Sequence, residues 1–418
     1  MEKLNWESPD SPISLAQRRE QACAFQRIRQ HLSTISVICV FISLFPPASG
    51  LAAILRVGAN RQYQTIRAAA AAVRDGDIVE VDRGIYIRDV ATWRKNNITV
   101  RASGGPVHLR ADGAYEGQKA IWIVQGSNFT VAGIEFSGAA PPAQKGAGIW
   151  VEAPGSVVIR NCQIHDNDNG IIALSNPNSK VLIENSTFEN NGYRNGASHN
   201  IFIGRIQSFT LRGCYSHKAL SGRNVKSQAM RNYILYNRIM DENSGTESIQ
   251  INLPEGGLAL VIGNIIQQGS RSIDGAIISC VAENAASGVL SLYTINNTIV
   301  NDTLIGGTFL KMRAGTLATV MNNIFYGPGK PWSKVGTRVV ASNNYREPEF
   351  NNSPRFVNPR EYNYRIFSDS PCVNAGTLLG LMRSFDLMPR RQYLYDAQSQ
   401  QRIIRGNIDI GAFEALRD

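Results

Sequence analysis

The sequence has no block of Lys and Arg, no His or Cys set at metal-ligand spacing, no Gly-rich phosphate loop and no aromatic RNA-binding signature. These absences argue against nucleic acid as a partner and against phosphate-loop enzymes. What the chain has is a modest excess of positive charge, with 43 Lys and Arg against 33 Asp and Glu and a formal net charge of +10. A basic surface attracts acidic partners, so acidic polysaccharides and anionic membranes stay open.

Cysteine is scarce, at six residues in 418, and two of the six lie in the first 52 residues. Cys162 and Cys214 hold equivalent positions two repeats apart, which in a stack of strands is roughly 9–10 Å. That distance is too long for a disulfide. We therefore expect the four remaining thiols to be small buried side chains, at Cys162, Cys214, Cys280 and Cys372.

Long apolar runs are also lacking. Residues 35–45 are apolar but too few to span a bilayer as a helix. They follow a polar, Arg-rich stretch and precede Pro46, Pro47 and a run of small residues. This order is typical of a secretory signal, so residues 1–52 are predicted to be a leader. The competing interpretation is an uncleaved membrane anchor. We expect export to the periplasm, the cell surface or the medium, with no stable membrane insertion after leader removal.

One short phrase recurs between residues 157 and 326: two apolar residues, a spacer and then Asn, replaced once by Gly. The copies end at Asn161, Asn185, Gly213, Asn237, Asn264, Asn297 and Asn323. Their spacing runs from 24 residues (185−161) to 33 residues (297−264). Such a loose period is typical of a solenoid whose turns vary while its strands do not. Stacked Asn side chains in a buried turn bond to one another, which explains the Asn without any functional role.

The apolar patches in each repeat are short, alternating and β-branched, which predicts strands rather than helices. Three such patches per repeat predict a triangular coil. The pattern resembles the pectate-lyase-like right-handed parallel β-helix over about residues 62–345. The resemblance implies an all-β fold built of three-strand coils and a monomeric protein.

The ends of the solenoid are predicted to be covered. A short amphipathic helix from Arg67 to Arg74 leads into the phrase Gly76-Asp77-Ile78-Val79 and resembles the N-terminal cap of secreted β-helices. A cap is needed because the first coil has an open apolar end and unpaired strand edges. After Tyr326 the rhythm fades, and the tail is predicted to be an irregular C-terminal cap. The predicted domains are a leader (1–52), a β-helix (53–346) and a capping segment (347–418).

β-helix enzymes similar to this chain bind a sugar chain along one outer sheet face. We therefore expect the substrate-binding residues on the third apolar patch of each repeat. Alternation predicts that Ile171, Ile201, Val225, Ile249 and Ile277 point inward and that their polar neighbours point outward. The predicted substrate-binding residues are His199, Asn200, Phe202, Arg223, Asn224, Gln228, Glu247, Ser248, Gln250 and Asn252.

Lys226 is the predicted catalytic base. The strand Asn224-Val225-Lys226-Ser227 resembles the Lys-Ser strand of the alginate lyase and chondroitinase B family, in which the Lys serves as the base in β-elimination. The resemblance covers about one coil, and the next coil offers Gln250 and Asn252 where that family has an Arg. Elimination needs a base for the proton α to a uronate carboxylate and a positive partner for the developing charge.

Three functions stay open. Under the first hypothesis the chain is a lyase acting on an acidic polysaccharide. Under the second it is a non-catalytic glycan-binding or adhesin-like protein. The third is a glycoside hydrolase with a carboxylate pair from Asp241, Glu242 or Glu247. No cofactor is predicted; calcium is compatible with such a site, but no acidic cluster indicates it. The sequence around His165 and Asp166 is predicted to be a polar turn.

Overall fold

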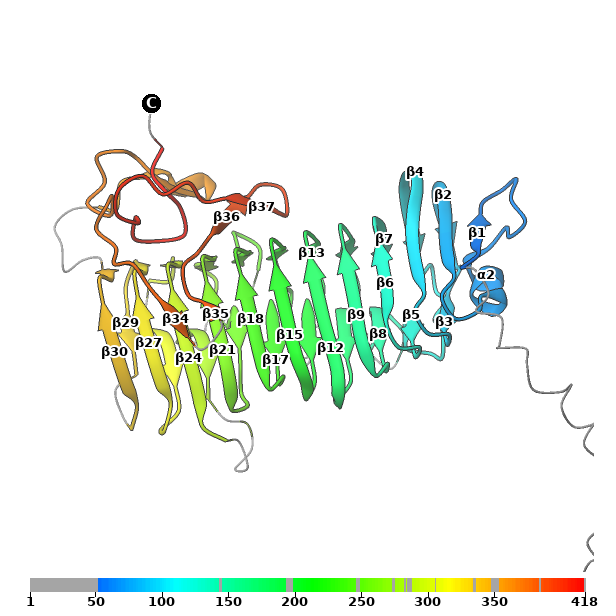
Figure 1. Ribbon diagram of the computed structural model, residues 1–418, viewed down its shortest axis with the longest axis horizontal. Coiled ribbons are helices and arrows are strands. Elements are labelled where there is room, and N and C mark those ends of the chain that lie inside the picture. The colour runs from blue at the N-terminus through cyan, green and yellow to red at the C-terminus, as the bar shows by residue number, and fades with distance from the viewer. Residues whose placement is uncertain are drawn as a thin grey trace, which may run out of the picture. The chain divides into compact units, whose positions relative to one another are not determined.

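The computed structural model describes residues 52–142, 145–192, 198–245, 249–272, 275–281, 283, 288–304, 306–333, 336–346, 353–382 and 385–416. Within these residues the chain is a stack of three-strand coils, which confirms the predicted parallel solenoid (Figure 1). Each coil contributes one strand to each of three faces, called face 1, face 2 and face 3. Strands that neighbour each other within a face run parallel.

The strands are grouped by face. Face 1 consists of β3 (Ala91–Trp93), β5 (Ala120–Val124), β8 (Ala147–Val151), β11 (Asn169–Ala173), β14 (Ile201–Ile203), β17 (Val225–Ser227), β20 (Ile251–Asn252), β23 (Ala276–Cys280), β26 (Thr308–Met312) and β29 (Lys330–Trp332). Face 2 consists of β1 (Ile54–Val57), β2 (Ile78–Ile87), β4 (Thr99–Arg110), β6 (Phe129–Ala132), β9 (Gly155–Arg160), β12 (Asn176–Glu184), β15 (Ile206–Arg212), β18 (Arg231–Leu235), β21 (Gly257–Ile262), β24 (Leu290–Ile295), β27 (Leu317–Met321) and β30 (Arg338–Ser342). Face 3 consists of β7 (Ile134–Ser137), β10 (Gln163–His165), β13 (Thr187–Glu189), β16 (Tyr215–His217), β19 (Arg238–Met240), β22 (Ile265–Gln268), β25 (Thr298–Asn301), β28 (Ile324–Tyr326) and β31 (Tyr345–Arg346). The long strand β4 pairs with β6 on face 2 and with β7 on face 3.

The helix α2 (Ile66–Ala72) lies at the N-terminal end of the stack, where the sequence predicts a capping helix (Figure 1). The Thr65 side chain accepts a hydrogen bond from the backbone N–H of Ala68 at 3.2 Å. The carboxylate of Asp89 accepts two more, from the backbone N–H groups of Ile66 at 2.6 Å and Arg67 at 2.9 Å. These bonds satisfy donors that a helix leaves free in its first turn.

The interior is filled by inward side chains that stack in register from coil to coil. Ile171, Ile201 and Val225 are fully buried, as predicted. In the next coil, however, Val225 pairs with Ile251, and Ile251 pairs with Ile278. The register position therefore lies two residues beyond the predicted Ile249, which is half-buried. Ile277 is buried in the core as predicted, although its neighbour Ile278 holds the register position. Turn length differs between coils, so alternation alone does not fix the register.

The recurring Asn occupies two different positions in the turn between faces 2 and 3. Asn161 and Asn185 have positive φ angles of 50° and 47° and are exposed, and Gly213 has the same backbone conformation with a φ of 63°. Asn tolerates this left-handed conformation better than most residues, and Gly tolerates it best. The first three copies of the phrase therefore end in a turn-forming residue and not in a stacked one.

The stacked position lies one residue further on. Neighbouring amides there hydrogen-bond to each other at 2.9–3.0 Å in a ladder of the buried Asn237, Asn264, Asn297 and Asn323 and the half-buried Asn344. The prediction of an Asn ladder is thus confirmed for the later coils. Cys162, Ser186 and Cys214 hold the equivalent position in the earlier coils. The four predicted thiols are buried and free of disulfides.

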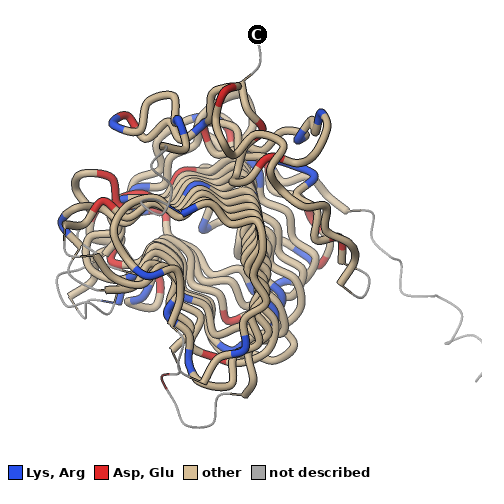
Figure 2. Tube along the Cα trace, turned by 90° about the vertical axis from the view of Figure 1, so that its left-hand side faces the viewer, with Lys and Arg blue, Asp and Glu red and all other residues tan. Residues whose placement is uncertain are grey.

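The C-terminal segment is irregular, as predicted. It contains β32 (Phe356–Asn358), η1 (Pro359–Glu361), β33 (Asn363–Ile366), β34 (Leu381–Met382), β35 (Phe385–Asp386), β36 (Arg391–Leu394) and β37 (Gln398–Gln401), and its strands pair as antiparallel hairpins. Viewed along the stack from its C-terminal end, the described part lies beside the coil cross-section and not over it (Figure 2).

The described tail therefore covers a flank, where the sequence predicts a cap on the open end. The reason is visible in the face 2–face 3 turns. The amide of Asn296 donates to the carbonyl of Asp409 at 2.9 Å, and that of Asn322 donates to the carbonyl of Thr377 at 2.8 Å. Turn amides of successive coils thus bind the tail's backbone along the flank. None of the helices in the described part of the chain is long and apolar enough to cross a membrane. The predicted leader lies outside the described residues.

Candidate functional site

One outward row of side chains runs along face 1, because strand pairing places one residue of each coil beside the next. We call it the face 1 row; it consists of Ile123, Trp150, Ile172, Phe202, Lys226, Asn252, Ser279 and Lys311. The row changes character along the stack. Its first half is aliphatic and aromatic, and its second half is polar with two lysines.

Lys226 points outward, since its strand neighbours Val225 and Ser227 are buried. Its Nζ atom lies 2.8 Å from Oε1 of Glu283 and 5.9 Å from the centroid of the Phe202 ring. Asn252, the next residue of the row, donates to the same Glu283 oxygen at 3.1 Å. Lys226 therefore lies between an aromatic ring and a carboxylate on an outer surface.

His199 lies directly beside this lysine. Its ring stacks on Phe202 with centroids 5.6 Å apart and planes inclined by 18°. Its Nδ1 accepts a hydrogen bond from the backbone N–H of Arg223 at 2.9 Å, so the ring proton is on Nε2. Burial, with smaller contributions from the positive charges of Lys226 and Arg223, lowers the pKa of His199 to about 3. The imidazole is thus a neutral N–H donor at neutral pH.

A second cation lies over a ring further toward the N-terminus. The Nζ of Lys119 is 5.3 Å from the centroid of Trp150 and 3.2 Å from the carboxylate of Glu152. Trp150 lies two coils before Phe202 in the face 1 row. Face 1 thus presents two aromatic rings, each with a lysine over it.

Three predicted substrate-binding amides do not reach this surface. Asn200, Asn224 and Gln250 are fully buried at the corner between faces 3 and 1, and their predicted outward orientation is wrong. Asn200 donates to Asn224 and Asn224 donates to Gln250, each at 2.8 Å. Gln250 then donates to the buried carboxylate of Asp241 at 2.7 Å. A solenoid corner leaves backbone and side-chain polar groups that need partners, and these amides satisfy one another.

The carboxylates of the hydrolase hypothesis are separated. Asp241 has no exposed surface and accepts from Gln250 and from the backbone N–H of Gly269, so it cannot reach a substrate in this arrangement. Glu242 lies on face 3 beside His217. Glu247 and Ser248 lie outside the described residues, so their predicted roles stay predictions.

Gln228 is not part of the face 1 row. It lines a groove of about 1280 Å³ between the face 1–face 2 turns and the tail. Tyr233, Tyr293 and Phe385 line the same groove, and the rings of Tyr233 and Phe385 are stacked 5.7 Å apart.

Of the predicted substrate-binding and catalytic residues, the structure brings together Phe202, Lys226, His199, Arg223 and Asn252.

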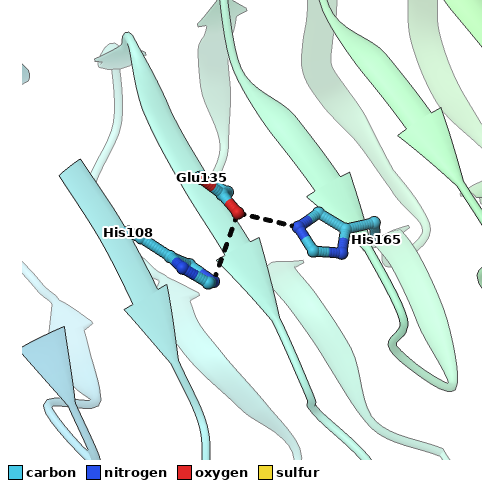
Figure 3. Close-up of side chains that lie close together, drawn as sticks. All are labelled: His108, Glu135 and His165. Carbon is cyan, nitrogen blue, oxygen red and sulfur yellow. Dashed lines mark hydrogen bonds and ion pairs between the residues drawn. The ribbon is translucent and has the colours of Figure 1, made fainter. Parts of the chain in front are cut away.

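Face 3 carries a cluster of two histidines and a glutamate that was not predicted from the sequence. His108 of β4, Glu135 of β7 and His165 of β10 converge on neighbouring strands, with both imidazoles turned toward the carboxylate (Figure 3). Oε1 of Glu135 lies 2.9 Å from Nε2 of His165 and 3.4 Å from Nε2 of His108. Nδ1 of His165 lies 2.7 Å from Asp166, and Nε2 of His108 lies 2.7 Å from the Ser137 hydroxyl.

The two histidines are held differently. Burial lowers the pKa of His108, and the nearby charge of Glu135 opposes that effect without reversing it. Burial would also lower the pKa of His165, but its contacts with Asp166 and Glu135 outweigh burial and raise it. The sequence contained a signal, since the three residues are spaced by 27 (135−108) and 30 (165−135), close to one coil each. Read alone, His165 and Asp166 predicted only a turn.

Further along face 3, charges are paired with one another. His165, Glu189 and His217 hold register positions on β10, β13 and β16. Lys218 lies 2.7 Å from Glu189, and His217 lies 3.1 Å from Glu242. Burial alone would raise the pKa of Glu242, but hydrogen bonds with His217 and Tyr215 and nearby positive charge outweigh it and hold the value at about 2.

Comparisons with known proteins agree with this architecture. A family model described as "Right handed beta helix region" matches residues 83–251. Among solved structures, pectate lyase Pel9A aligns with a TM-score of 0.61 and 16% identity, over 87% of this chain and 96% of its own. The chain has the right-handed parallel β-helix fold.

Other structures are similar to this β-helix protein over a smaller share. An alginate lyase from Paenibacillus sp. str. FPU-7 aligns with 13% identity and a TM-score of 0.46, over 70% of this chain and 99% of its own. A pectin methylesterase from Aspergillus niger aligns with 12% identity and a TM-score of 0.32, over 68% of this chain and 86% of its own. No curated protein matches the sequence. At these identities the likeness is one of fold.

Proposed function

We propose that this β-helix protein is exported, binds an acidic polysaccharide along the face 1 row and cleaves it by β-elimination with Lys226 as the base. The observation that carries the proposal is the placement of Lys226 outward, in register with Phe202 and beside the neutral imidazole of His199. The export part rests on residues 1–52 and is a separate proposal.

Binding would use both halves of the row. Trp150 and Phe202 offer flat apolar faces against which a sugar ring can pack. Lys119 and Lys226 lie over these rings and supply positive charge for uronate carboxylates. The two rings are two coils apart, which at the usual strand spacing is roughly 10 Å. That distance suits contact with every second sugar of one extended chain.

Elimination would begin when the neutral Lys226 amine takes the proton α to a uronate carboxylate. The electron pair of that C–H bond forms a carbon–carbon double bond, and the bond to the leaving sugar oxygen breaks. Solvent returns a proton to that oxygen. Negative charge builds on the carboxylate in the transition state, and the Nε2–H of His199 and the charge of Arg223 would stabilise it.

Glu283 is the obstacle in this scheme. Its carboxylate lies 2.8 Å from Lys226 Nζ and holds the side chain in an ion pair, away from a substrate. An acidic substrate entering the row repels this carboxylate. Substrate binding and release of Lys226 would therefore occur together, and a neutral glycan would be a poor substrate.

The test is the ultraviolet absorbance of unsaturated product from alginate, pectate and chondroitin sulfate. Lys226→Ala should lower the rate by about 100-fold or more, as expected for loss of a general base. Lys311→Ala is the matched control, because Lys311 lies on the same row, exposed and further along the stack; its rate should stay near that of the wild type.

The alternatives give different results. New reducing ends without absorbance would establish a hydrolase. Binding in an affinity gel without either product would establish a non-catalytic glycan-binding protein. Equal losses in Lys226→Ala and Lys311→Ala would contradict the assignment of Lys226 as the base.

A further inference from the structure

The His108–Glu135–His165 cluster lies on face 3 and takes no part in the function proposed above. Its three side chains come from three successive strands, so each is fixed by a paired backbone and not by a loop. Their ligand atoms all lie within 4.8 Å of one another. Within the described ranges, no other set of three His, Cys, Asp or Glu side chains meets this condition.

The separations are near those around a small dication, and none exceeds 4.8 Å. A zinc ion bonded at about 2.0–2.2 Å to each tetrahedral ligand holds the ligand atoms roughly 3.3–3.6 Å apart. The carboxylate oxygen of Glu135 is 3.4 Å from Nε2 of His108 and 2.9 Å from Nε2 of His165. A shift of a few tenths of an ångström opens the shorter distance, and each side chain is partly exposed. A metal would also replace the 2.7 Å contact of His108 Nε2 with the Ser137 hydroxyl.

The ligand types select the ion. Two imidazoles and one carboxylate suit zinc and neighbouring transition metals, whereas calcium and magnesium prefer sites made of oxygen. Asp166 lies 2.7 Å from Nδ1 of His165, on the far side of the ring from Glu135. A carboxylate in that position fixes the ring orientation and tautomer of a metal-binding histidine.

We propose that His108, Glu135 and His165 bind one transition-metal dication of the zinc type, through the two Nε2 atoms and the Glu135 carboxylate. Three protein ligands leave at least one position for water or a substrate oxygen, as in open zinc sites. Because the ligands belong to three coils, the ion also ties β4, β7 and β10 together and stabilises the N-terminal half of the stack.

The experiment titrates zinc chloride into the full-length, chelator-treated protein by calorimetry and counts bound metal by mass spectrometry after dialysis. We expect one zinc ion per chain. His165→Gln and His108→Gln should each weaken binding by about 100-fold, and Asp166→Asn should weaken it by about 10-fold. Cobalt binding should give a visible absorption band that the histidine variants lose.

His217→Gln is the matched control, because His217 holds a register position on the same face as His165 but has no second histidine beside it. It should bind zinc like the wild type. Circular dichroism in chelator checks that each variant folds, and His108→Gln serves if His165→Gln does not. No saturable 1:1 binding, or equal binding by the wild type and the double variant His108→Gln/His165→Gln, would overturn the proposal.

Discussion

Faces 1 and 3 have the same backbone geometry and carry opposite kinds of outer surface. On face 3, ionisable side chains lie next to partners of opposite charge, as in Lys218 with Glu189 at 2.7 Å and His165 with Glu135 at 2.9 Å. On face 1, Lys226 and Lys119 are also paired with carboxylates, but each lies in addition over an aromatic ring, Phe202 or Trp150. A parallel solenoid thus sets the spacing of its side chains, and their chemistry alone decides what each face can bind.

The difference has a physical consequence for ligands. An acidic polymer approaching either face would compete with carboxylates already paired to the cations there, including Glu283 and Glu152 on face 1. On face 1 it also meets apolar rings that desolvate at little cost, close to the lysines. A metal ion has the opposite preference, because it needs a carboxylate and imidazoles together.

The largest effect on polysaccharide binding should come from removing the aromatic rings of face 1. Phe202→Ala and Trp150→Ala should each weaken binding of an acidic polysaccharide about 10-fold, and together about 100-fold, since each ring supplies on the order of 1 kcal/mol beyond simple area. Calorimetry or an affinity gel measures this. Lys218→Ala removes a cation from face 3 instead and should leave binding unchanged. Equal weakening by Lys218→Ala would mean that net charge, and not face 1, governs binding.

A smaller effect should follow from Glu283→Gln. The amide oxygen still accepts from Asn252, but the negative charge beside Lys226 is gone. Lys226 is then released from its ion pair and can reach the substrate, so turnover should rise by about 3- to 10-fold. Initial rates of unsaturated product measure it. A fall in rate would show that Glu283 assists the reaction and does not obstruct it.

The fold could be predicted from the sequence because a solenoid repeats the same apolar alternation in each coil. Each coil restates the alternation of Val157 to Arg160, and averaging over coils overcomes the weakness of each short strand. The outward placement of Lys226 and Phe202 followed from the same alternation. The register at Gln250 did not, because the turns before β17 and β20 differ in length.

The buried corner could not be predicted from residue type. Asn200 and Asn224 have the polarity of surface residues, yet they are buried because each satisfies its neighbour. The face 3 cluster was hidden for a related reason. His108, Glu135 and His165 become neighbours only once the length of every intervening turn is known.

Groups on the two faces should also contribute differently to the loss of folding stability at acid pH. The ordinary pKa of His199 is 6.5, and burial with the charges of Lys226 and Arg223 lowers it to about 3. Between these values the unfolded chain binds a proton that the folded chain does not, so stability falls as pH drops from 6.5 toward 3. His199→Asn should flatten this part of the curve, by up to about 1.4 kcal/mol per pH unit. Urea unfolding at several pH values measures it.

Glu242 provides the face 3 half of the same measurement. Its pKa is about 2 in the folded chain against an ordinary 4.5, so its contribution is complete above pH 4.5 and is lost as pH falls toward 2. Glu242→Gln should flatten only this lower stretch and leave the slope between pH 6.5 and 4.5 unchanged. The two stretches overlap between pH 4.5 and 3, so the stretch between pH 6.5 and 4.5 decides the comparison. If Glu242→Gln also flattened that stretch, the two faces would not titrate independently. If only His199→Asn flattened it, burial beside cations on face 1 and charge pairing on face 3 would be distinct sources of acid sensitivity.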